Sequence, residues 1–186
     1  MQTIAHFEYT DPGFEKPTPE FLTDGQYSQM LSTISFGCCD TLIVTDVGFL
    51  LVKRKAKPAT GQWWVTGGRR EMGETKSEAA ARCFKRETGL EVSLERFTLM
   101  GIADCRWNSR QQKPQDAGTH QDVYVHLLKL SNEEVGKLKF DPQEFRPEDW
   151  CVIPFDKAGI MTLEGKFHPY IGWITSLAIR HPLLLG

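Results

Sequence analysis

The apolar residues of the chain fall into short runs that charged and glycine-containing breaks separate. Two of these runs, 41–44 and 49–52, flank the break TDVG, and this pattern predicts a β-hairpin with a glycine turn. The segment QWWVTGG (62–68) predicts a third strand that runs into a glycine pair. Further strands are expected at 90–104, 122–130 and 149–153.

Two segments have the pattern of helices. Residues 77–90 (SEAAARCFKRETGL) have an alanine-rich interior, with Ser77 as the candidate N-cap and Gly89 as a natural stop. Residues 170–181 (YIGWITSLAIRH) predict a terminal helix with one apolar face. Strands, a central helix, further strands and a terminal helix together predict an α+β sandwich.

Length, charge and cysteine content narrow the class of protein. A chain of 186 residues has the size of one domain, and the polar, proline-bearing residues 1–30 are expected to form an irregular arm ahead of a single domain at 31–186. A net charge of −2 supplies no broad field for nucleic acid or an anionic membrane. No apolar run approaches the roughly 18 residues of a membrane span. The polar, acidic start and five cysteines without a C-x-x-C pair predict a cytoplasmic protein.

The densest group of charged residues lies between Gly67 and Leu90. The Gly67-Gly68 pair allows the main chain to approach a ligand closely. On the helix that follows, Cys83 and Glu87 lie one turn apart on one face. A carboxylate on such a face can hold Mg²⁺, whose other coordination sites go to waters and substrate phosphates.

Arginines in the same stretch offer planar donors that suit phosphate oxygens, namely Arg69, Arg70, Arg82 and Arg86. The alternative interpretation is structural: Arg82 pairs with Glu74 to fix the loop before the helix, and Arg86 is solvated. For Arg70, Arg86 and Glu78 this structural interpretation is favoured, because exposed charges usually contribute little.

The spacing of these residues resembles the signature of the Nudix hydrolases, G-x5-E-x7-R-E-U-x-E-E-x-G-U, in which U is a bulky apolar residue. Its places are held by Gly68, Glu74, Arg82, Phe84, Glu87, Gly89 and Leu90. Cys83 and Arg86 stand where the family has two metal-binding glutamates. The resemblance implies a Nudix-type α/β/α sandwich with a mixed central sheet, and a hydrolase that holds one Mg²⁺ ion per site at most.

One branch of that superfamily, the GDP-mannose mannosyl hydrolases, departs from the signature in the same places and cleaves a sugar C–O bond. The segment CCDTLIV resembles the strand with its catalytic aspartate, which assigns that role to Asp40. The segment VKRKAKPATGQWWVTGGRR is similar to K-R-x-x-R-P-A-x-G-x-W-x-V-P-G-G-R, which places the two functional arginines on Arg54 and Arg69. Arg82 takes the place of the Nudix arginine and is expected to contact substrate.

The resemblance implies a mechanism with one Mg²⁺ ion on a diphosphate leaving group. The ion would be held by Glu87, the single metal glutamate, and by the Gly67 carbonyl. Arg69, with Arg54, would stabilise the departing diphosphate, and Asp40 would steady the oxocarbenium-like sugar. Water would attack the anomeric carbon and invert it. Such proteins often dimerise, so a homodimer is a further expectation.

The general base is the point at which this chain departs from the branch, which has Gln-His before an Asp-rich segment that ends in Trp. The corresponding stretch here is DPQEFRPEDW, which has no histidine. With one inserted residue, Gln143 and Glu144 take the two places, and without it Glu144 and Phe145 do. Glu144 could be the base if burial raises its pKa, or a second metal ligand beside Gln143. His120 and His126, on one face of a strand, are minor candidates for the base.

Aromatic and loop residues add two expectations about the pocket. Trp63 and Trp64 point to opposite faces of their strand, so one is expected in the core, and Trp64 is assigned to the substrate pocket. The long polar loop 106–121 is of the kind that forms binding lids. The cysteines at 38, 39 and 83 are interpreted as small buried residues and not as nucleophiles.

Three functions stay open from the sequence. The favoured one is a Mg²⁺-dependent hydrolase of a nucleoside diphosphate sugar. The second is a pyrophosphatase that recruits its metal ligands from Glu71, Glu74, Glu78 or the stretch 144–149. The third is a module that binds a nucleotide without turning it over, which the missing histidine favours.

Overall fold

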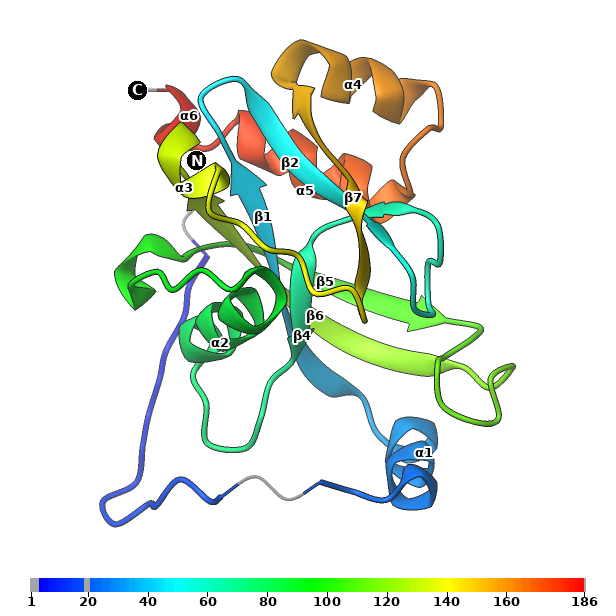
Figure 1. Ribbon diagram of the computed structural model, residues 1–186. Helices are drawn as coiled ribbons and strands as arrows, with labels where there is room; N and C mark the ends of the chain where they lie inside the picture. The colour runs from blue at the N-terminus through cyan, green and yellow to red at the C-terminus, as the bar shows by residue number, and fades with distance from the viewer. Residues whose placement is uncertain (1–3, 19–20, 186) are drawn as a thin grey trace.

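A seven-stranded mixed sheet with helices on both faces forms the centre of the molecule, described by a computed structural model for residues 4–18 and 21–185 (Figure 1). Its strands are β1 (Phe36–Val44), β2 (Gly48–Arg54), β3 (Trp63–Trp64), β4 (Thr66–Arg69), β5 (Thr98–Trp107), β6 (Thr119–Lys129) and β7 (Phe145–Pro154). The main path runs β3-β2-β1-β6-β5, with β4 paired to β1 and β7 to β2. Only the β1–β6 pair is parallel among the described strands. The predicted α+β class with a mixed sheet is confirmed.

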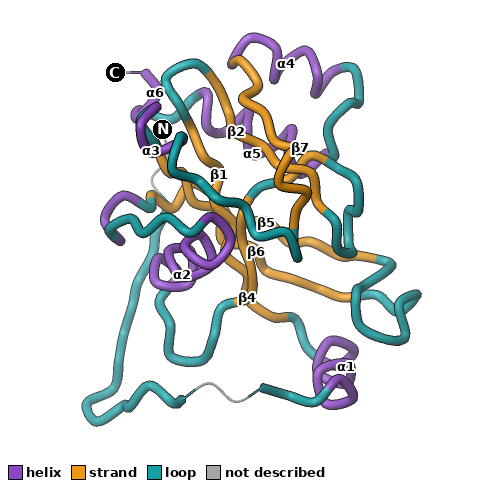
Figure 2. The backbone as a smooth tube through the Cα atoms, viewed as in Figure 1, coloured by secondary structure: helices purple, strands orange, loops and turns teal. Residues whose placement is uncertain are grey.

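Helices cover the sheet and close its ends (Figure 2). They are α1 (Asp24–Thr33), α2 (Lys76–Thr88), the 3₁₀ turn Leu94–Arg96, α3 (Asn132–Val135), α4 (Phe155–Leu163), α5 (Pro169–Ile179) and α6 (Pro182–Leu185). Over the ranges 4–18 and 21–185, the helices lack the length and the apolar character that a membrane span requires.

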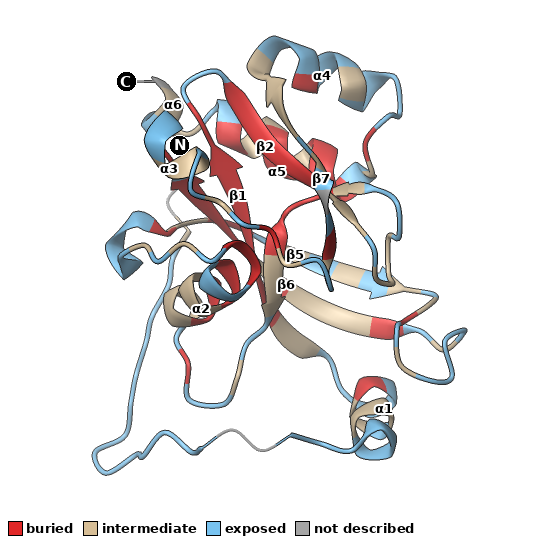
Figure 3. Cartoon of the chain, in the orientation of Figure 1, coloured by how far each residue is buried: buried red, intermediate tan, exposed pale blue. Residues whose placement is uncertain are grey.

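The alternation of side chains along β1 produces two apolar clusters, one on each face of the sheet. Figure 3 shows that most of β1 and β2 is buried. Leu42 packs in the cluster that contains Ile174 of α5, whereas its neighbour Ile43 packs in the cluster that contains Phe84 of α2. All four side chains are at most 1% exposed. The predicted hairpin is confirmed: β1 and β2 are antiparallel. The central strands therefore give the site a rigid floor.

Helix α2 begins two residues earlier than predicted. Thr75, not Ser77, is the N-cap, because Thr75 has extended backbone and forms a capping box with Glu78. The Glu78 carboxylate accepts the Thr75 N–H at 2.7 Å. Gly89 ends the helix as predicted, with a φ of 70° in the left-handed region. The stop at Gly89 sets the position of the last turn of the helix, which carries Glu87.

Two of the predicted strands differ from the structure, one in being divided and the other in where it begins. The segment 62–68 forms β3 and then β4, because the chain changes partner from β2 to β1 at this point. The strand expected over 90–104 begins only at Thr98, after the 3₁₀ turn, and it continues to Trp107. The loop expected over 106–121 is shortened accordingly.

Part of the predicted N-terminal arm is helical. The arm was expected to be irregular over 1–30, but α1 starts at Asp24, where Thr23 and Gln26 form a capping box. Residues 1–3 and 19–20 of that arm, and Gly186 at the other end, lie outside the described residues. The division into arm and domain stays a prediction.

Candidate functional site

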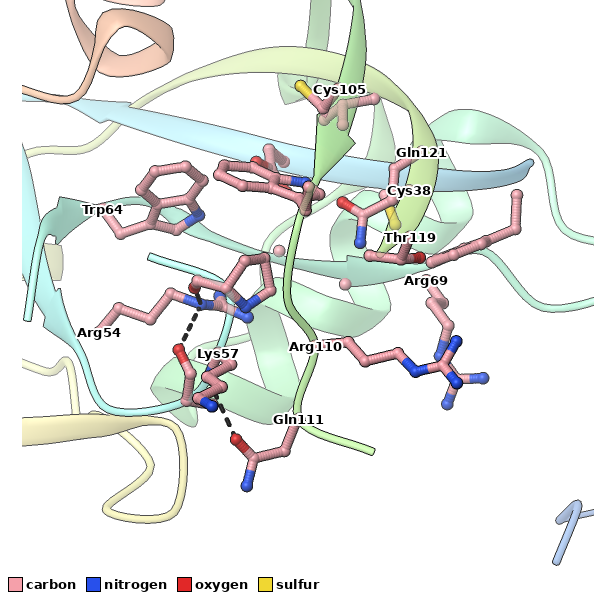
Figure 4. Close-up of a pocket in the computed structure, with 18 of the residues that line it drawn as sticks. Cys38, Arg54, Lys57, Trp64, Arg69, Cys105, Arg110, Gln111, Thr119 and Gln121 are labelled. Atoms are coloured by element: carbon pink, nitrogen blue, oxygen red, sulfur yellow. Dashed lines mark hydrogen bonds between the residues drawn. The ribbon is translucent and has the colours of Figure 1, made fainter. Parts of the chain in front are cut away.

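A cavity of about 250 Å³ lies beside β1 and β4, with further walls from α1, α2, α5 and the loops (Figure 4). The predicted site residues that line it are Asp40, Arg54, Trp64, Gly67, Arg69, Glu87 and Glu144. Two predicted residues, Arg82 and Gln143, do not line it. The sequence therefore located most of one site, although its parts come from distant segments.

Pairing of β1 with β4 brings the Asp40 and Gly67 backbones opposite each other. A Cβ atom at Gly67 would lie 2.2 Å from Asp40 Oδ1 and 2.7 Å from the Cys39 carbonyl oxygen. Only glycine fits at this position, because no larger residue leaves space for the Asp40 carboxylate. The close approach of the two strands thus explains Gly67 without any ligand.

The Asp40 carboxylate is buried at the cavity wall, where Tyr170 Oη donates a hydrogen bond of 2.8 Å to its Oδ2. Burial raises the pKa of Asp40 to about 6, and the Tyr170 bond and the Arg54 charge oppose that rise. The Tyr170 ring stacks on Trp64 with the ring centres 5.2 Å apart. Sequence reasoning missed Tyr170, which was assigned to a terminal packing helix. Nothing in the local pattern distinguishes it.

Glu87 is almost fully buried, and both of its carboxylate oxygens are occupied. Oε2 accepts the Gly67 N–H at 2.8 Å, and Oε1 accepts from Arg86 Nη2 at 2.8 Å. Burial raises the pKa of Glu87 to about 7, and these two bonds oppose the rise. The same Arg86 Nη2 lies 3.4 Å from the Gly67 carbonyl oxygen. A guanidinium therefore bridges the two groups that were predicted to share the metal ion.

Arg86 is exposed to solvent, as expected, with 46% of its side chain accessible, but its guanidinium also lines the cavity and pairs with Glu87, which was not expected. Its position in the signature, where a metal-binding glutamate is expected, was the signal that could have identified it. The Arg86 guanidinium therefore places a positive charge beside the Glu87 carboxylate and the Gly67 carbonyl oxygen.

The two predicted phosphate-binding arginines lie along the cavity without an acidic partner. The Arg69 guanidinium carbon lies 4.0 Å from the centre of the Tyr27 ring of α1. Arg54 Nε donates to the carbonyls of Ala56 and Pro58 at 3.2 and 2.9 Å. Neither Arg54 nor Arg69 forms an ion pair within the described part of the chain. Their charges are thus available to an anionic ligand.

Arg82 lies outside the cavity and holds the loop before α2. Its Nε and Nη2 donate to the two Glu74 oxygens at 2.6 and 2.9 Å, and its Nη1 lies 3.3 Å from Glu71. Nη2 also donates to the Arg69 carbonyl at 2.8 Å. Direct substrate contact by Arg82 does not fit this geometry, and the structural interpretation of the Arg82–Glu74 pair does. Of the acids proposed for recruitment, Glu71, Glu74 and Glu78 do not line the cavity, Glu78 being part of the helix cap, whereas Glu144 does.

The stretch around residue 144 supplies one free acid. Glu144 lines the cavity, and its side chain makes no hydrogen bond or ion pair with the residues of 4–18 and 21–185. Gln143 is exposed outside the cavity, so its predicted role as a metal ligand does not fit. His120 contacts Asp104 on the surface, and His126 is buried elsewhere with its pKa lowered by burial to about 4. Neither histidine lines the cavity.

The donors at this site do not fit a resident divalent ion. Within the described ranges, no group of three or more His, Cys, Asp or Glu side chains is placed to hold a metal. The carboxylates that line the cavity are Asp40, Glu87 and Glu144, and Arg86 already contacts both of the groups that were predicted to share the ion, Glu87 and the Gly67 carbonyl. Mg²⁺ prefers an octahedral set of oxygen ligands, several of them waters. A guanidinium within hydrogen-bond distance of Glu87 and the Gly67 carbonyl occupies the space that the ion would need.

The buried cysteines are structural, as predicted. Burial raises the pKa of Cys39 to about 12 and that of Cys83 to about 11, so both are protonated thiols at neutral pH. Trp63 is only partly buried, with the Lys53 ammonium 5.2 Å from its ring centre, whereas Trp64 faces the cavity.

Comparison with known proteins gives one family match and several partial relatives. A family model described as NUDIX domain matches residues 39–171. The chain is 31% identical over 81 residues to the low-salt glycan biosynthesis protein Agl8 of Haloferax volcanii. The matched residues cover 44% of this chain and 51% of that protein. It is 47% identical over 63 residues to the ADP-ribose pyrophosphatase of Methanocaldococcus jannaschii, covering 34% and 36%. The chain thus spans about half or less of the length of these relatives.

Solved structures support the fold. The MutT protein from Methanosarcina mazei superposes with a TM-score of 0.57 at 16% identity, covering 79% of this chain and 96% of that one. The MutT NUDIX hydrolase from Burkholderia pseudomallei superposes with a TM-score of 0.52 at 24% identity, covering 66% and 85%. At these identities the likeness concerns the arrangement of helices and strands alone.

Proposed function

The chain belongs to the NUDIX family, and we propose that it hydrolyses a nucleoside diphosphate linked to a sugar. The observation that carries this proposal is the presence of Arg54 and Arg69, without acidic partners in the described chain, in one cavity with the buried carboxylate of Asp40. Planar guanidiniums in a partly enclosed space favour an anion with several oxygens, such as a diphosphate.

The names of the relatives fit the same class of substrate. Agl8 is named for glycan biosynthesis, and the archaeal pyrophosphatase is named for ADP-ribose. ADP-ribose is itself a nucleoside diphosphate linked to a sugar. We propose glycosyl C–O cleavage of the GDP-mannose type, a proposal that the buried Asp40 carboxylate at the cavity wall supports, because that chemistry uses a carboxylate to stabilise the sugar cation.

The proposed step uses side chains that line the cavity. A water molecule attacks the anomeric carbon, Glu144 takes the proton of the water, and the glycosidic C–O bond breaks with its electron pair left on the diphosphate. Arg69 and Arg86 stabilise the negative charge that develops on the diphosphate. The Asp40 carboxylate stabilises the positive charge that develops on the sugar ring. The products are a free sugar and a nucleoside diphosphate.

Arg86 supplies, in this proposal, the fixed positive charge for which Mg²⁺ was expected. Nudix hydrolases generally use divalent metal ions. Here the guanidinium already contacts Glu87 and the Gly67 carbonyl. The proposed mechanism therefore takes its positive charge from Arg86, where the sequence-based mechanism takes it from Mg²⁺. Both act on a nucleoside diphosphate sugar.

Product identity tests the proposed reaction. We expect a panel of ADP-, GDP- and UDP-linked sugars to include a substrate that yields free sugar and nucleoside diphosphate, with and without EDTA, as followed by phosphorus NMR. Nucleoside monophosphate and sugar phosphate would instead establish pyrophosphate cleavage. Tight binding with no product would establish a binding module. The ion pair between Glu87 and Arg86 favours this alternative, because it engages the carboxylate that would otherwise hold a metal ion.

Removing the Arg69 side chain is expected to weaken binding of a nucleoside diphosphate. One charge-assisted hydrogen bond contributes roughly 1.5–3 kcal/mol, so Arg69→Ala is expected to raise the Kd about tenfold to a hundredfold. Arg70→Ala is the matched control, because Arg70 lies 5.6 Å from the Tyr124 ring centre and does not line the cavity. Titration calorimetry with ADP, GDP and UDP measures both. Equal weakening by the two variants would mean that general charge, not the cavity, governs binding.

A further inference from the structure

Arg110 is a buried arginine with no acidic partner. Its side chain is only 2% exposed, although it comes from the loop between β5 and β6. Nη2 donates to Ser28 Oγ at 2.7 Å, and Nη1 donates to Ser32 Oγ at 2.9 Å and to the Gly118 carbonyl at 3.4 Å. Its Nε has no acceptor among the described residues. A charge held only by neutral oxygens in a buried place is costly, which points to a missing anion.

Two further donors beside the same cavity lack a partner. Trp107 Nε1 and Thr119 Oγ1 are buried and make no hydrogen bond within the described part of the molecule. The two residues are directly opposite each other on β5 and β6, so their side chains share one face of the sheet. Arg110, Trp107 and Thr119 all line the cavity. Three unsatisfied donors at one wall are unusual, because buried polar atoms are normally paired.

We propose that Arg110, Trp107 and Thr119 form a second anion subsite of the cavity, which binds a carboxylate or phosphate that the ligand carries beyond its diphosphate. This inference rests on the proposed function, because it assumes that the diphosphate occupies the Arg54 and Arg69 region. Figure 4 shows Arg110 and Thr119 on the same side of the cavity as Arg69, with Arg54 and Trp64 on the other side, so the subsite adjoins the Arg69 end of the diphosphate region. An anionic oxygen supplies the acceptor that each of the three donors lacks.

The chemistry of the wall selects an anion and not a neutral hydroxyl. Trp107 Nε1 and Arg110 Nε are donors only, so a group with several acceptor oxygens satisfies both. The Asp40, Glu87 and Glu144 carboxylates line the cavity too, but Arg110 contacts none of them. The contacts of Arg110 with α1 run through two serine hydroxyls, which are weaker acceptors than a charged oxygen.

Binding of matched ligand pairs tests the subsite. UDP-glucose and UDP-glucuronate differ by a carboxylate, and dephospho-coenzyme A and coenzyme A differ by a ribose phosphate. We expect the more anionic member of at least one pair to bind the wild-type chain about tenfold more tightly, as one charge-assisted hydrogen bond provides. Arg110→Gln is expected to abolish that preference while the Kd of the less anionic member changes less than about twofold. The pair that shows the preference identifies carboxylate or phosphate as the group.

A second variant keeps the test independent of folding. Thr119→Val removes one donor and leaves the Arg110 contacts with α1 in place, and we expect it to lower the preference about threefold, as one neutral hydrogen bond contributes. A preference that is absent from the wild type, or that persists unchanged in both variants, overturns the subsite while binding of the less anionic ligands upholds the proposed function. GDP-mannose, titrated alongside, separates the two failures. If it binds and none of the four ligands does, the subsite alone fails, and if it does not bind either, the proposed function fails with the subsite.

Discussion

Replacing Arg86 by glutamate is expected to convert this site into a divalent-metal site. In Arg86→Glu the guanidinium that bridges Glu87 and the Gly67 carbonyl is replaced by a second carboxylate, and Glu144 lines the same cavity. Without a cation the new acid repels buried Glu87, so the variant is expected to unfold at a lower temperature in EDTA. Mg²⁺ or Mn²⁺ at about a hundred times its Kd should then raise the free energy of unfolding of the variant by about 2.7 kcal/mol.

Two comparisons identify the source of that effect. The wild-type chain is expected to show the same thermal midpoint, and the same affinity for a nucleoside diphosphate, in EDTA and in Mg²⁺. Arg86→Gln removes the guanidinium without adding an acid, so a metal-dependent rise of its midpoint should stay well below that of Arg86→Glu. A wild-type chain that needs Mg²⁺ to bind nucleoside diphosphate would show that Arg86 leaves the site, and the role assigned to it would be wrong.

The sequence predicted the floor of the site better than its walls. Asp40, Gly67 and Glu87 belong to two strands and a helix that the sequence pattern predicts, and of the three only Glu87 holds a place in the signature. Their convergence follows from local structure and from the β1–β4 pairing. The boundary of α2 was missed by two residues because Thr75 and Ser77 are both capable N-caps, and only the capping box with Glu78 decides between them.

The walls depend on contacts between residues far apart in the chain. Tyr170 reaches Asp40 across 130 positions, and Arg110 reaches Ser28 across 82. Neither residue has a neighbour pattern that indicates its partner, because a single tyrosine or loop arginine is compatible with many environments. Arg86 shows a different limit: its place in the signature was known, but whether its guanidinium faces solvent or Glu87 is decided by packing that the sequence does not encode locally.

Asp40→Asn is expected to abolish turnover and, at neutral pH, to stabilise the fold. Burial raises the Asp40 pKa from 3.8 to about 6, so the folded chain holds this proton more tightly than the unfolded chain does. The contribution of Asp40 to stability is fully present below pH 3.8 and is lost as the pH rises through about 6. Above that range the buried carboxylate costs roughly 2–4 kcal/mol. Asparagine avoids this cost, and its side-chain oxygen can still accept the Tyr170 hydroxyl.

Turnover follows the opposite sign, because the reaction needs the ionised carboxylate. Wild-type kcat should rise with pH through about 6, and Asp40→Asn should lower it at least about a hundredfold at every pH, as loss of a group that opposes developing charge does. Tyr170→Phe is the matched control: it removes the hydrogen bond that favours the ionised form, so the rise should move to higher pH. Thermal unfolding at pH 5 and pH 8 completes the test, as roughly opposite sides of the Asp40 transition. Equal stability of Asp40→Asn and wild type at the higher pH would contradict a buried, ionised Asp40, because an acid held at such a wall cannot be both charged and free of cost.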